Sequence, residues 1–314
     1  MNMTSPADSP ERPIVALIAG PTASGKSALA LALAQKHRGT IINADSMQVY
    51  ADLRILTARP SVEEETRVPH RLFGHVDGAD AYSAARWAAE ARAVIAEAHR
   101  DGRLPILVGG TGMYLRTLLD GIAPVPEIDP AIRAEVRALP VAQAHAALSK
   151  LDAKAAARLN PADTLRVARA LEVVRATGKP LAAWQSDRVG GIAGEIRLAP
   201  LILLPDRDWL GERIDRRFRI MVDQGGEEAA ALLARTDIPQ DAPILRAIGV
   251  PEMRALLAGE IEADMAITQG ALASRQYAKR QYTWFRRQPP PDWTRETETE
   301  TNKQMATIET KLLI

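Results

Sequence analysis

The chain has 314 residues, a net charge of +1 and 46% hydrophobic residues, so it is long enough to bury a sizeable core. It contains no cysteine, which excludes structural disulfides and thiolate metal sites, and its five histidines lack the spacing of zinc ligands. No apolar run reaches the length of a membrane span and Met1–Pro13 lacks the apolar middle of a signal peptide, which predicts a cytoplasmic protein that does not bind membranes.

The first half of the chain alternates strand-like and helix-like segments. Ile14–Ala19 is a continuous apolar run typical of a buried parallel strand, and Thr40–Ala44 and Leu104–Val108 are expected to form two further short strands. The helices expected to follow these strands include Ala28–His37, Ala84–His99 and Met113–Leu119. This order predicts an α/β fold, a doubly wound parallel sheet whose binding loops lie at the carboxyl ends of the strands.

The segment Gly20–Ser27 (GPTASGKS) matches the phosphate-binding pattern G-x-x-x-x-G-K-[ST] at every fixed position, between a strand and a helix. In such a P-loop, backbone N–H groups turn inward onto phosphate oxygens, and the helix adds its positive N-terminal end. Lys26 would neutralise a terminal phosphate and Ser27 would ligate Mg²⁺. The alternative is a glycine-rich turn with a surface lysine, which the flanking elements disfavour. The residues expected to hold a di- or triphosphate are Gly20, Pro21, Thr22, Ala23, Ser24, Gly25, Lys26 and Ser27.

Two further loops follow predicted strands. Asp45 comes at the end of the second strand, where a carboxylate can serve as a metal ligand, a sugar-hydroxyl acceptor, a general base or a simple cap. Gly109–Gly112 stands where hydrolytic P-loop proteins usually carry an aspartate for Mg²⁺. Its N–H groups and the Thr111 hydroxyl suit oxygen recognition, and Thr111 can also cap the next helix. The residue types alone leave these roles open.

The pattern changes after Gly121. Prolines and then helix-like segments predict a helical insertion over residues 122–195, and Ile196–Pro205 returns to strand character. The expected core therefore comprises residues 1–121 and 196–293. Residues 294–314 are low in apolar residues and are expected to form a mobile tail, with docking of Ile308–Ile314 left open.

Two helices of the second half are rich in arginine. In Trp209–Gln224 the arginines alternate with acidic residues, which is typical of a solvated face, although one arginine could reach the phosphates. In Leu272–Arg287, basic residues and aromatics suit an RNA backbone and an unstacked base, whereas the alternative is an amphipathic helix with core aromatics. The residues on one face of this helix are Arg275, Lys279, Tyr282 and Arg286.

Together these stretches resemble the tRNA dimethylallyltransferase (isopentenyltransferase) family, in its bacterial type. The stretches that match, within residues 14–293, include GPTASGKS (20–27), DSMQVY (45–50), GGTGMYL (109–115), RALEVVRATGKPL (169–181) and RQYAKRQYTWFR (275–286). The resemblance implies transfer of a dimethylallyl group from dimethylallyl diphosphate to N6 of the adenosine 3′ of the anticodon. It further implies a tRNA anticodon stem-loop as partner, Mg²⁺ as cofactor and no obligate protein partner.

The resemblance also implies roles for individual residues. Asp45 would be the general base for the N6 proton, Thr111 would contact the diphosphate, and Arg217 would stabilise the charge on the departing diphosphate. The residues implied in tRNA binding are Asp45, Ser46, Met47, Gln48, Thr111, Arg133, Leu165, Arg166, Val167, Ala168, Arg169, Arg275, Lys279 and Arg280. The chain departs from the family pattern outside the catalytic set, notably at Arg54, Leu56, Arg59 and Arg71.

Two other functions compete with this interpretation. A P-loop small-molecule kinase would share the phosphate loop and Asp45 but would need neither the insertion nor the basic helix. An RNA-binding module with a relic P-loop would bind tRNA and catalyse nothing.

Overall fold

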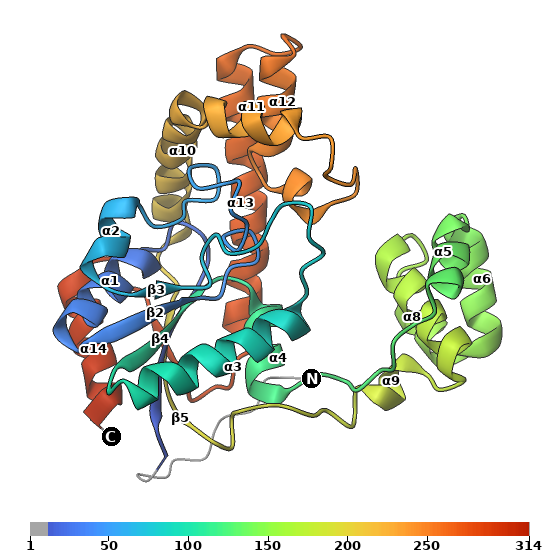
Figure 1. The fold of residues 1–314 in the computed structure, drawn as a ribbon, viewed down its shortest axis with the longest axis horizontal. Helices are drawn as coiled ribbons and strands as arrows, with labels where there is room; N and C mark the ends of the chain where they lie inside the picture. Colours follow the sequence, from blue (N-terminus) through green and yellow to red (C-terminus); the bar gives the residue numbers. More distant parts are fainter. Residues whose placement is uncertain (1–11, 314) are drawn as a thin grey trace. The chain divides into compact units, whose positions relative to one another are not determined.

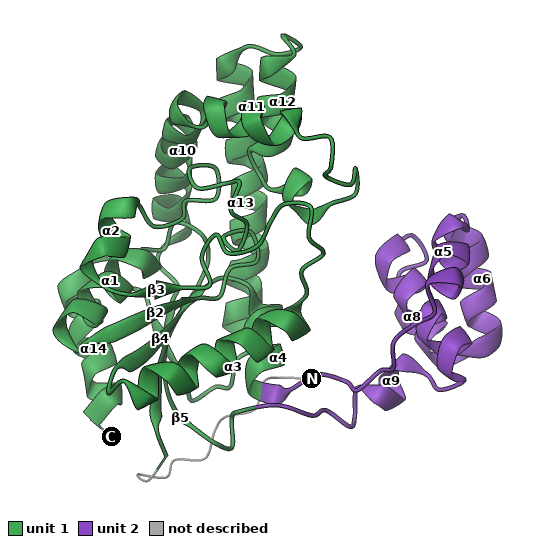
Figure 2. Cartoon of the chain, viewed as in Figure 1, with its two compact units in different colours: residues 1–119, 192–314 green, residues 120–191 purple. Residues whose placement is uncertain are grey.

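The computed structural model describes residues 12–313, so the expectation for the N-terminal segment concerns residues that lie almost wholly outside it. The chain forms two compact units (Figure 2): unit 1 joins Met1–Leu119 to Ile192–Ile314, and unit 2 is Asp120–Gly191. Within residues 12–313, no helix is long and apolar enough to cross a membrane.

Unit 1 is built on a parallel sheet in the order β3-β2-β4-β1-β5-β6 (Figure 1). The strands are β1 (Ile14–Ala19), β2 (Gly39–Asn43), β3 (His70–Arg71), β4 (Leu104–Gly109), β5 (Arg197–Leu203) and β6 (Thr294–Glu296). β1 lies inside the sheet and pairs with β4 and β5, so that Ala19 stands beside Gly109 and Ile202. Because β1, β2 and β4 are parallel and close, the segments that follow them leave the same edge of the sheet. The α/β class predicted from the alternation is confirmed.

Helices cover both faces of this sheet. Those of unit 1 are α1 (Lys26–Lys36), α2 (Val62–Arg67), α3 (Ala84–Arg100), α4 (Gly112–Asp120), α10 (Arg207–Gln224), α11 (Gly226–Ala234), the 3-10 helix η1 (Pro243–Arg246), α12 (Val250–Leu257), α13 (Ala263–Arg287) and α14 (Thr301–Leu313). Alternate residues of β1 pack on opposite faces, as a strand's period of two requires. Ala16 and Ile18 join a core with residues of α1, whereas Val15 and Leu17 join a larger core with Trp87 of α3.

The C-terminal segment is where the sequence-based expectation was wrong. Residues 294–314 were expected to be mobile, but β6 pairs with β5 and α14 contacts both α1 and β5. Ile308 is fully buried in the core that α1 covers, and Glu309 accepts hydrogen bonds from Lys36 and His37 of α1. One buried face and a few ion pairs are sufficient to hold a helix whose other residues are polar.

Replacing Ile308 with alanine is therefore expected to lower the free energy of unfolding by about 2–5 kcal/mol, because it leaves a cavity in the core. Urea denaturation measures this change. Leu313→Ala, at a residue 87% exposed on the same helix, is the matched control and should change stability by less than about 0.5 kcal/mol. Equal, small effects of both substitutions would mean that the helix is not docked in solution.

Unit 2 is a small helical unit with its own core. Its helices are α5 (Pro130–Ala138), α6 (Val141–Leu151), α7 (Ala153–Arg158), α8 (Thr164–Thr177) and α9 (Leu181–Trp184). α8 packs against α5 and α6, with Val167 and Leu171 fully buried. The carboxylate of Glu172 is also buried, and Arg137 Nε donates to it at 3.1 Å. This pairing compensates the burial of a charge in so small a core.

Candidate active site

The P-loop follows β1 and leads into α1. Gly20 has a φ of 147°, and a Cβ on it would lie 2.4 Å from the carbonyl oxygen of Leu203 in β5. Gly25, just before α1, has a φ of 95°, a conformation that favours glycine. The loop opens into a cavity of about 340 Å³, here called the P-loop cavity. It is lined by Ala23–Ala28, Asp45, Gln48, Ala58, Glu64, Val108, Gly109, Arg213 and Arg217.

Lys26 lies in this cavity with its Nζ 2.6 Å from the carbonyl oxygen of Pro21. Burial lowers the pKa of Lys26 to about 7; the carboxylate of Asp45 opposes this shift and the guanidinium of Arg217 adds to it. The ammonium is therefore only partly populated at neutral pH in the free protein. A bound polyanion would stabilise the charged form and restore its full population.

Binding of inorganic diphosphate at pH 8 is consequently expected to take up a proton at Lys26, and the affinity should fall as the pH rises above about 7. A proton is taken up because the Lys26 amine of the free protein is mostly neutral at pH 8, whereas it is charged in the complex. Calorimetry in buffers of different ionisation enthalpy measures the uptake. Lys26→Met is the control, and equal proton uptake by this variant would contradict the assignment.

The turn after β2 places Asp45 against Thr111. The buried side chain of Asn43 accepts a hydrogen bond from Asp45 N at 2.8 Å and donates one to Asp45 O at 2.9 Å. Ser46 N donates to Thr111 Oγ1 at 3.0 Å, which ties this turn to the Gly109–Gly112 loop. Asp45 Oδ1 accepts from Met47 N at 2.9 Å, so the carboxylate has a defined orientation. The two residues predicted to share a site therefore lie on loops that are hydrogen-bonded to each other, although Thr111 is not among the residues that line the P-loop cavity.

Among the arginines of α10, Arg217 is the one whose side chain is partly buried against the P-loop. It is partly buried and donates a hydrogen bond to Thr22 Oγ1, whereas its neighbours Arg216 and Arg219 are exposed. Burial lowers the pKa of Arg217, and nearby Asp45 acts in the opposite direction. The exposed Arg213 contributes a hydrogen bond from Nε to the carbonyl oxygen of Ala23 at 3.0 Å. The solvated-face interpretation holds for the exposed arginines but not for Arg217.

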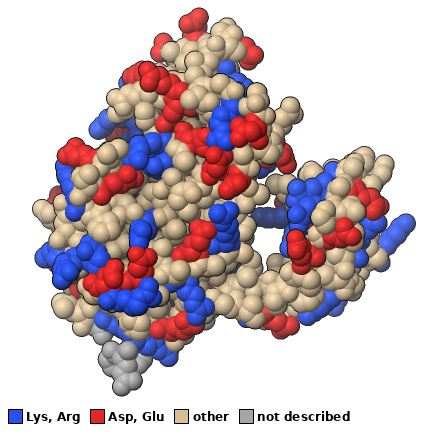
Figure 3. All heavy atoms as spheres, in the orientation of Figure 1, with Lys and Arg blue, Asp and Glu red and all other residues tan. Residues whose placement is uncertain are grey.

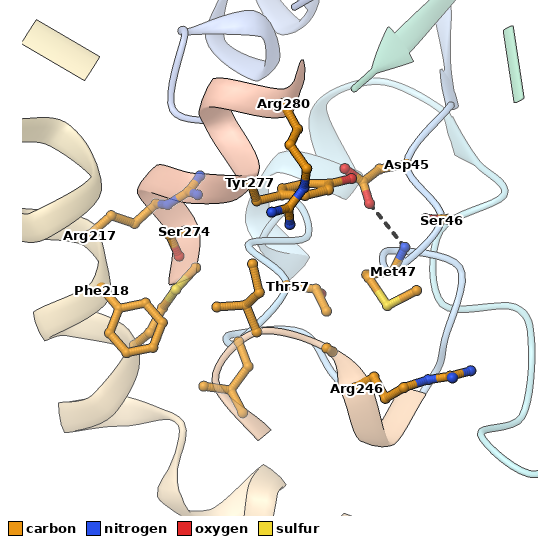
Figure 4. Close-up of a pocket in the computed structure, with 14 residues that line it drawn as sticks. Asp45, Ser46, Met47, Thr57, Arg217, Phe218, Arg246, Ser274, Tyr277 and Arg280 are labelled. Carbon is orange, nitrogen blue, oxygen red and sulfur yellow. Dashed lines mark hydrogen bonds between the residues drawn. The ribbon is translucent and has the colours of Figure 1, made fainter. Parts of the chain in front are cut away.

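A second cavity, of about 300 Å³, adjoins the P-loop cavity and shares Asp45 and Arg217 with it. We call it the acceptor-side cavity. Its other lining residues are Ser46, Met47, Leu56, Thr57, Phe218, Met221, Arg246, Ala247, Ile248, Ser274, Tyr277 and Arg280. Figure 4 shows Asp45, Tyr277 and Arg280 close together on one side, with Phe218 on another. The Asp45 carboxylate and the Arg217 guanidinium thus lie where the P-loop cavity meets the partly apolar acceptor-side cavity.

Gln281 of α13 is a site residue for which no role was predicted from the sequence. Its Oε1 accepts from Thr22 N of the P-loop at 2.8 Å, and its Nε2 donates to Gly110 O at 2.9 Å. The side chain is buried, so this one amide connects the phosphate loop to the loop that carries Thr111. Tyr277, one turn earlier, hydrogen-bonds Thr111, and burial raises its pKa. The signal available in the sequence was a polar residue on the buried face of α13, with Ser274, Ala278 and Phe285.

Gln281→Glu is expected to lower kcat/KM for the reaction proposed below about 10–100-fold, mainly through a weaker apparent affinity for the phosphate-bearing substrate. A carboxylate can still accept from Thr22 N, but it cannot donate to Gly110 O and would repel it. Steady-state kinetics with a varied concentration of that substrate measures this. Gln276→Glu, on the exposed side of the same helix, is the matched control, and equal effects of both would refute the bridging role.

Two aromatics of α13, Trp284 and Phe285, pack in the core, as the second interpretation of this helix expected, whereas Tyr277 lines the acceptor-side cavity. Phe285 is fully buried, and the ring of Trp284 lies against Gly112 at the start of α4. A Cβ at Gly112 would come within 2.5 Å of that ring, which explains the glycine. α13 also begins at Ala263, earlier than the predicted Leu272.

The residues implied in tRNA binding do not form one surface in unit 1. Arg280 lines the acceptor-side cavity with Ser46 and Met47. Arg275 and Lys279 line a separate hollow of about 230 Å³ beside α10, where Arg275 pairs with Asp215. The side-chain amide of Gln48 is occupied by the carbonyl oxygens of Thr57 and Ala58, at 2.9 and 2.8 Å. Gln48 therefore holds the loop that contains Thr57 and Ala58 and also lines the P-loop cavity.

The implied tRNA contacts of unit 2 divide into two groups. Val167 and Ala168 are buried in the core of the unit, so any contact that they make with RNA would come from their backbone, and this expectation stays a prediction. Leu165 and Arg166 are exposed on α8, as is Arg133 on α5, and Arg169 lies near the buried Glu172. Figure 3 shows Lys and Arg side chains over much of the visible face of this unit. The exposed arginines and lysines of this unit are the residues whose side chains can contact RNA phosphates.

The P-loop cavity also has oxygen atoms that suit a divalent cation. Ser27 and Asp45 line it, and a hydroxyl and a carboxylate are ligands that Mg²⁺ accepts together with phosphate oxygens. Ser27 immediately follows Lys26, so a cation held by its hydroxyl would lie beside the phosphates that the loop binds.

The chain matches two family models, "IPP transferase" over residues 48–288 and "Isopentenyl transferase" over residues 13–82. A tRNA dimethylallyltransferase of Sphingopyxis alaskensis is 65% identical over 286 residues, covering 90% of this chain and 93% of the relative. One of Erythrobacter litoralis is 59% identical over 297 residues, covering 93% of each chain.

The chain is also similar to solved structures of two such transferases. The tRNA isopentenylpyrophosphate transferase of Bacillus halodurans is 35% identical, with a TM-score of 0.67, covering 96% of this chain and 99% of that one. A eukaryotic dimethylallyltransferase described as acting on tRNA is 27% identical, with a TM-score of 0.80, covering 96% of this chain and 79% of that one.

Proposed function

The chain belongs to the IPP transferase family, and from this we propose that it transfers a dimethylallyl group from dimethylallyl diphosphate to N6 of the adenosine that follows the anticodon in tRNA. The observation that carries the proposal is the pair of adjoining cavities that share Asp45 and Arg217. One suits the diphosphate and the other an organic group with its acceptor. The reacting atoms would meet where the two cavities join.

The residues of the site would act as follows. Lys26 and Arg217 hold the diphosphate and stabilise the charge that it gains as its bond to the allylic carbon breaks. The N6 nitrogen forms the new bond to that carbon, and its proton passes to the Asp45 carboxylate. Thr111 holds the Asp45 turn in place through its bond from Ser46 N. When bound, Mg²⁺ on Ser27 would add further charge neutralisation at the diphosphate.

The acceptor adenosine must leave its stack to reach Asp45, at a cost of a few kcal/mol. Exposed arginines of unit 2, Arg133 and Arg166 among them, would hold the anticodon stem-loop through its phosphates. A tRNA acceptor implies a cytoplasmic protein. One anticodon loop per chain would make a monomer adequate.

The experiment that tests the proposal incubates the purified protein with Mg²⁺, dimethylallyl diphosphate and unmodified tRNA, and looks for N6-dimethylallyladenosine by mass spectrometry of the digested tRNA. We expect one modified adenosine per acceptor tRNA and release of diphosphate. A parallel reaction with ATP and small-molecule acceptors tests the kinase alternative. ATP consumption with untouched tRNA would overturn the proposal, and so would tight tRNA binding with neither reaction.

A further inference from the structure

One wall of the acceptor-side cavity is apolar. Phe218 and Met221 of α10 form one part of it, and Leu56 and Ile248 come from two other segments. Phe218 directly follows Arg217, so this apolar wall begins next to the group that holds the diphosphate. A prenyl group whose diphosphate occupied the P-loop cavity would pass Arg217 and run along this wall.

Leu56 is held in this wall with little freedom. A Cβ at Gly225 would lie 2.8 Å from Leu56 Cδ2, and one at Gly249 would lie 3.1 Å from the same atom, so the side chain rests directly on two stretches of backbone. Its own backbone is equally fixed, because the Glu228 carboxylate accepts from the N–H groups of Arg54, Ile55 and Leu56 at 2.6–2.9 Å. Three charge-assisted bonds to consecutive residues hold the loop firmly.

The part of the wall formed by Phe218 is also fixed. The Phe218 ring lies on Gly270 of α13, where a Cβ would come within 1.9 Å of the ring. Neither Leu56 nor Phe218 can therefore move away to admit a longer prenyl group unless a helix also moves. A rigid apolar wall discriminates between ligands that differ in length, whereas a soft wall would adapt to them.

We propose that Leu56 is a specificity-determining residue that limits the length of the prenyl group the site accepts, an inference that rests on the proposed function. Its side chain forms part of the apolar wall that also contains Phe218, so that a dimethylallyl group would fit beside it and the longer geranyl group would collide with it. The departure from the family pattern at Leu56 thereby acquires a function in donor selection.

The test compares kcat/KM for geranyl diphosphate and for dimethylallyl diphosphate, with the same tRNA, in the wild-type protein and in Leu56→Ala. The ratio of the two constants is expected to rise on the order of 10-fold in the variant, because space for several carbon atoms is opened. Leu56→Val, a smaller truncation, covers the case in which Leu56→Ala does not fold, and it should shift the ratio in the same direction by less.

Leu53→Ala is the matched control, since Leu53 is a fully buried leucine of the same loop that does not line the cavity. It should lower the melting temperature but leave the donor ratio unchanged. An unchanged ratio in both folded Leu56 variants, or a change confined to KM for tRNA, overturns the inference while dimethylallyl transfer stands. A wild-type protein that transfers no dimethylallyl group overturns both.

Discussion

Replacing Asp45 with asparagine is expected to lower kcat for dimethylallyl transfer about 10²–10⁴-fold, the range usual for loss of a general base. The asparagine side-chain oxygen can still accept from Met47 N, as Asp45 Oδ1 does at 2.9 Å, so the turn and its bond to Thr111 should persist. Only the ability to take the N6 proton is lost. Single-turnover kinetics with saturating tRNA and donor measures the chemical step directly.

The matched control is Asp206→Asn, at the N-cap of α10, where the side chain likewise accepts from backbone N–H groups. It should transfer at close to the wild-type rate. Binding of donor and tRNA to the Asp45 variant, measured separately, should stay within a few-fold of wild type. A fall of less than about tenfold in the chemical step would mean that another group accepts the proton.

Replacing Arg217 with lysine is expected to lower kcat about 10²–10³-fold although the charge is retained. The guanidinium lines both cavities and donates to Thr22 Oγ1 at the same time, and a compact ammonium cannot do both. Because this charge acts on the departing diphosphate, the loss should appear in kcat more than in KM for the donor. Rapid-quench measurement of the transfer step distinguishes the two.

Arg216→Lys provides the control, since Arg216 is the exposed neighbour on the same helix. It should behave as wild type. An Arg217→Lys variant with normal kcat and a raised KM would show that Arg217 binds the ground state and the transition state equally.

The central strands were predictable from the sequence because each is buried on both faces and reads as a continuous apolar run. This holds for β1, β4 and β5, whereas the buried strand β2 also contains the polar residues Thr40 and Asn43. The edge strands β3 and β6 were not predicted, since they are two and three residues long and polar (His70–Arg71 and Thr294–Glu296). Such short strands form because an adjacent strand offers unpaired backbone N–H and C=O groups. No pattern in the residues of the short strand itself predicts this pairing.

The phosphate loop was equally predictable, because its function depends on the spacing of residues close in sequence. Gln281 was not, since its role depends on two loops that are 171 and 259 residues away along the chain. The basic face predicted for α13 (Arg275, Lys279, Tyr282, Arg286) is adjacent to the buried face that contains Gln281. The charged residues of α13 therefore gave no indication of what its buried face contacts.

The topology of the sheet also has a consequence for how the protein folds. β1 comes early in the chain, yet its two neighbours are β4 and β5, the second of which lies beyond the whole of unit 2. Contacts between distant segments slow the formation of a native state, whereas the helices of unit 2 contact one another locally. We therefore expect unit 2 to be able to form while β1 still lacks its partner β5, and the P-loop to acquire its shape only after β5 has joined the sheet and placed Leu203 against Gly20.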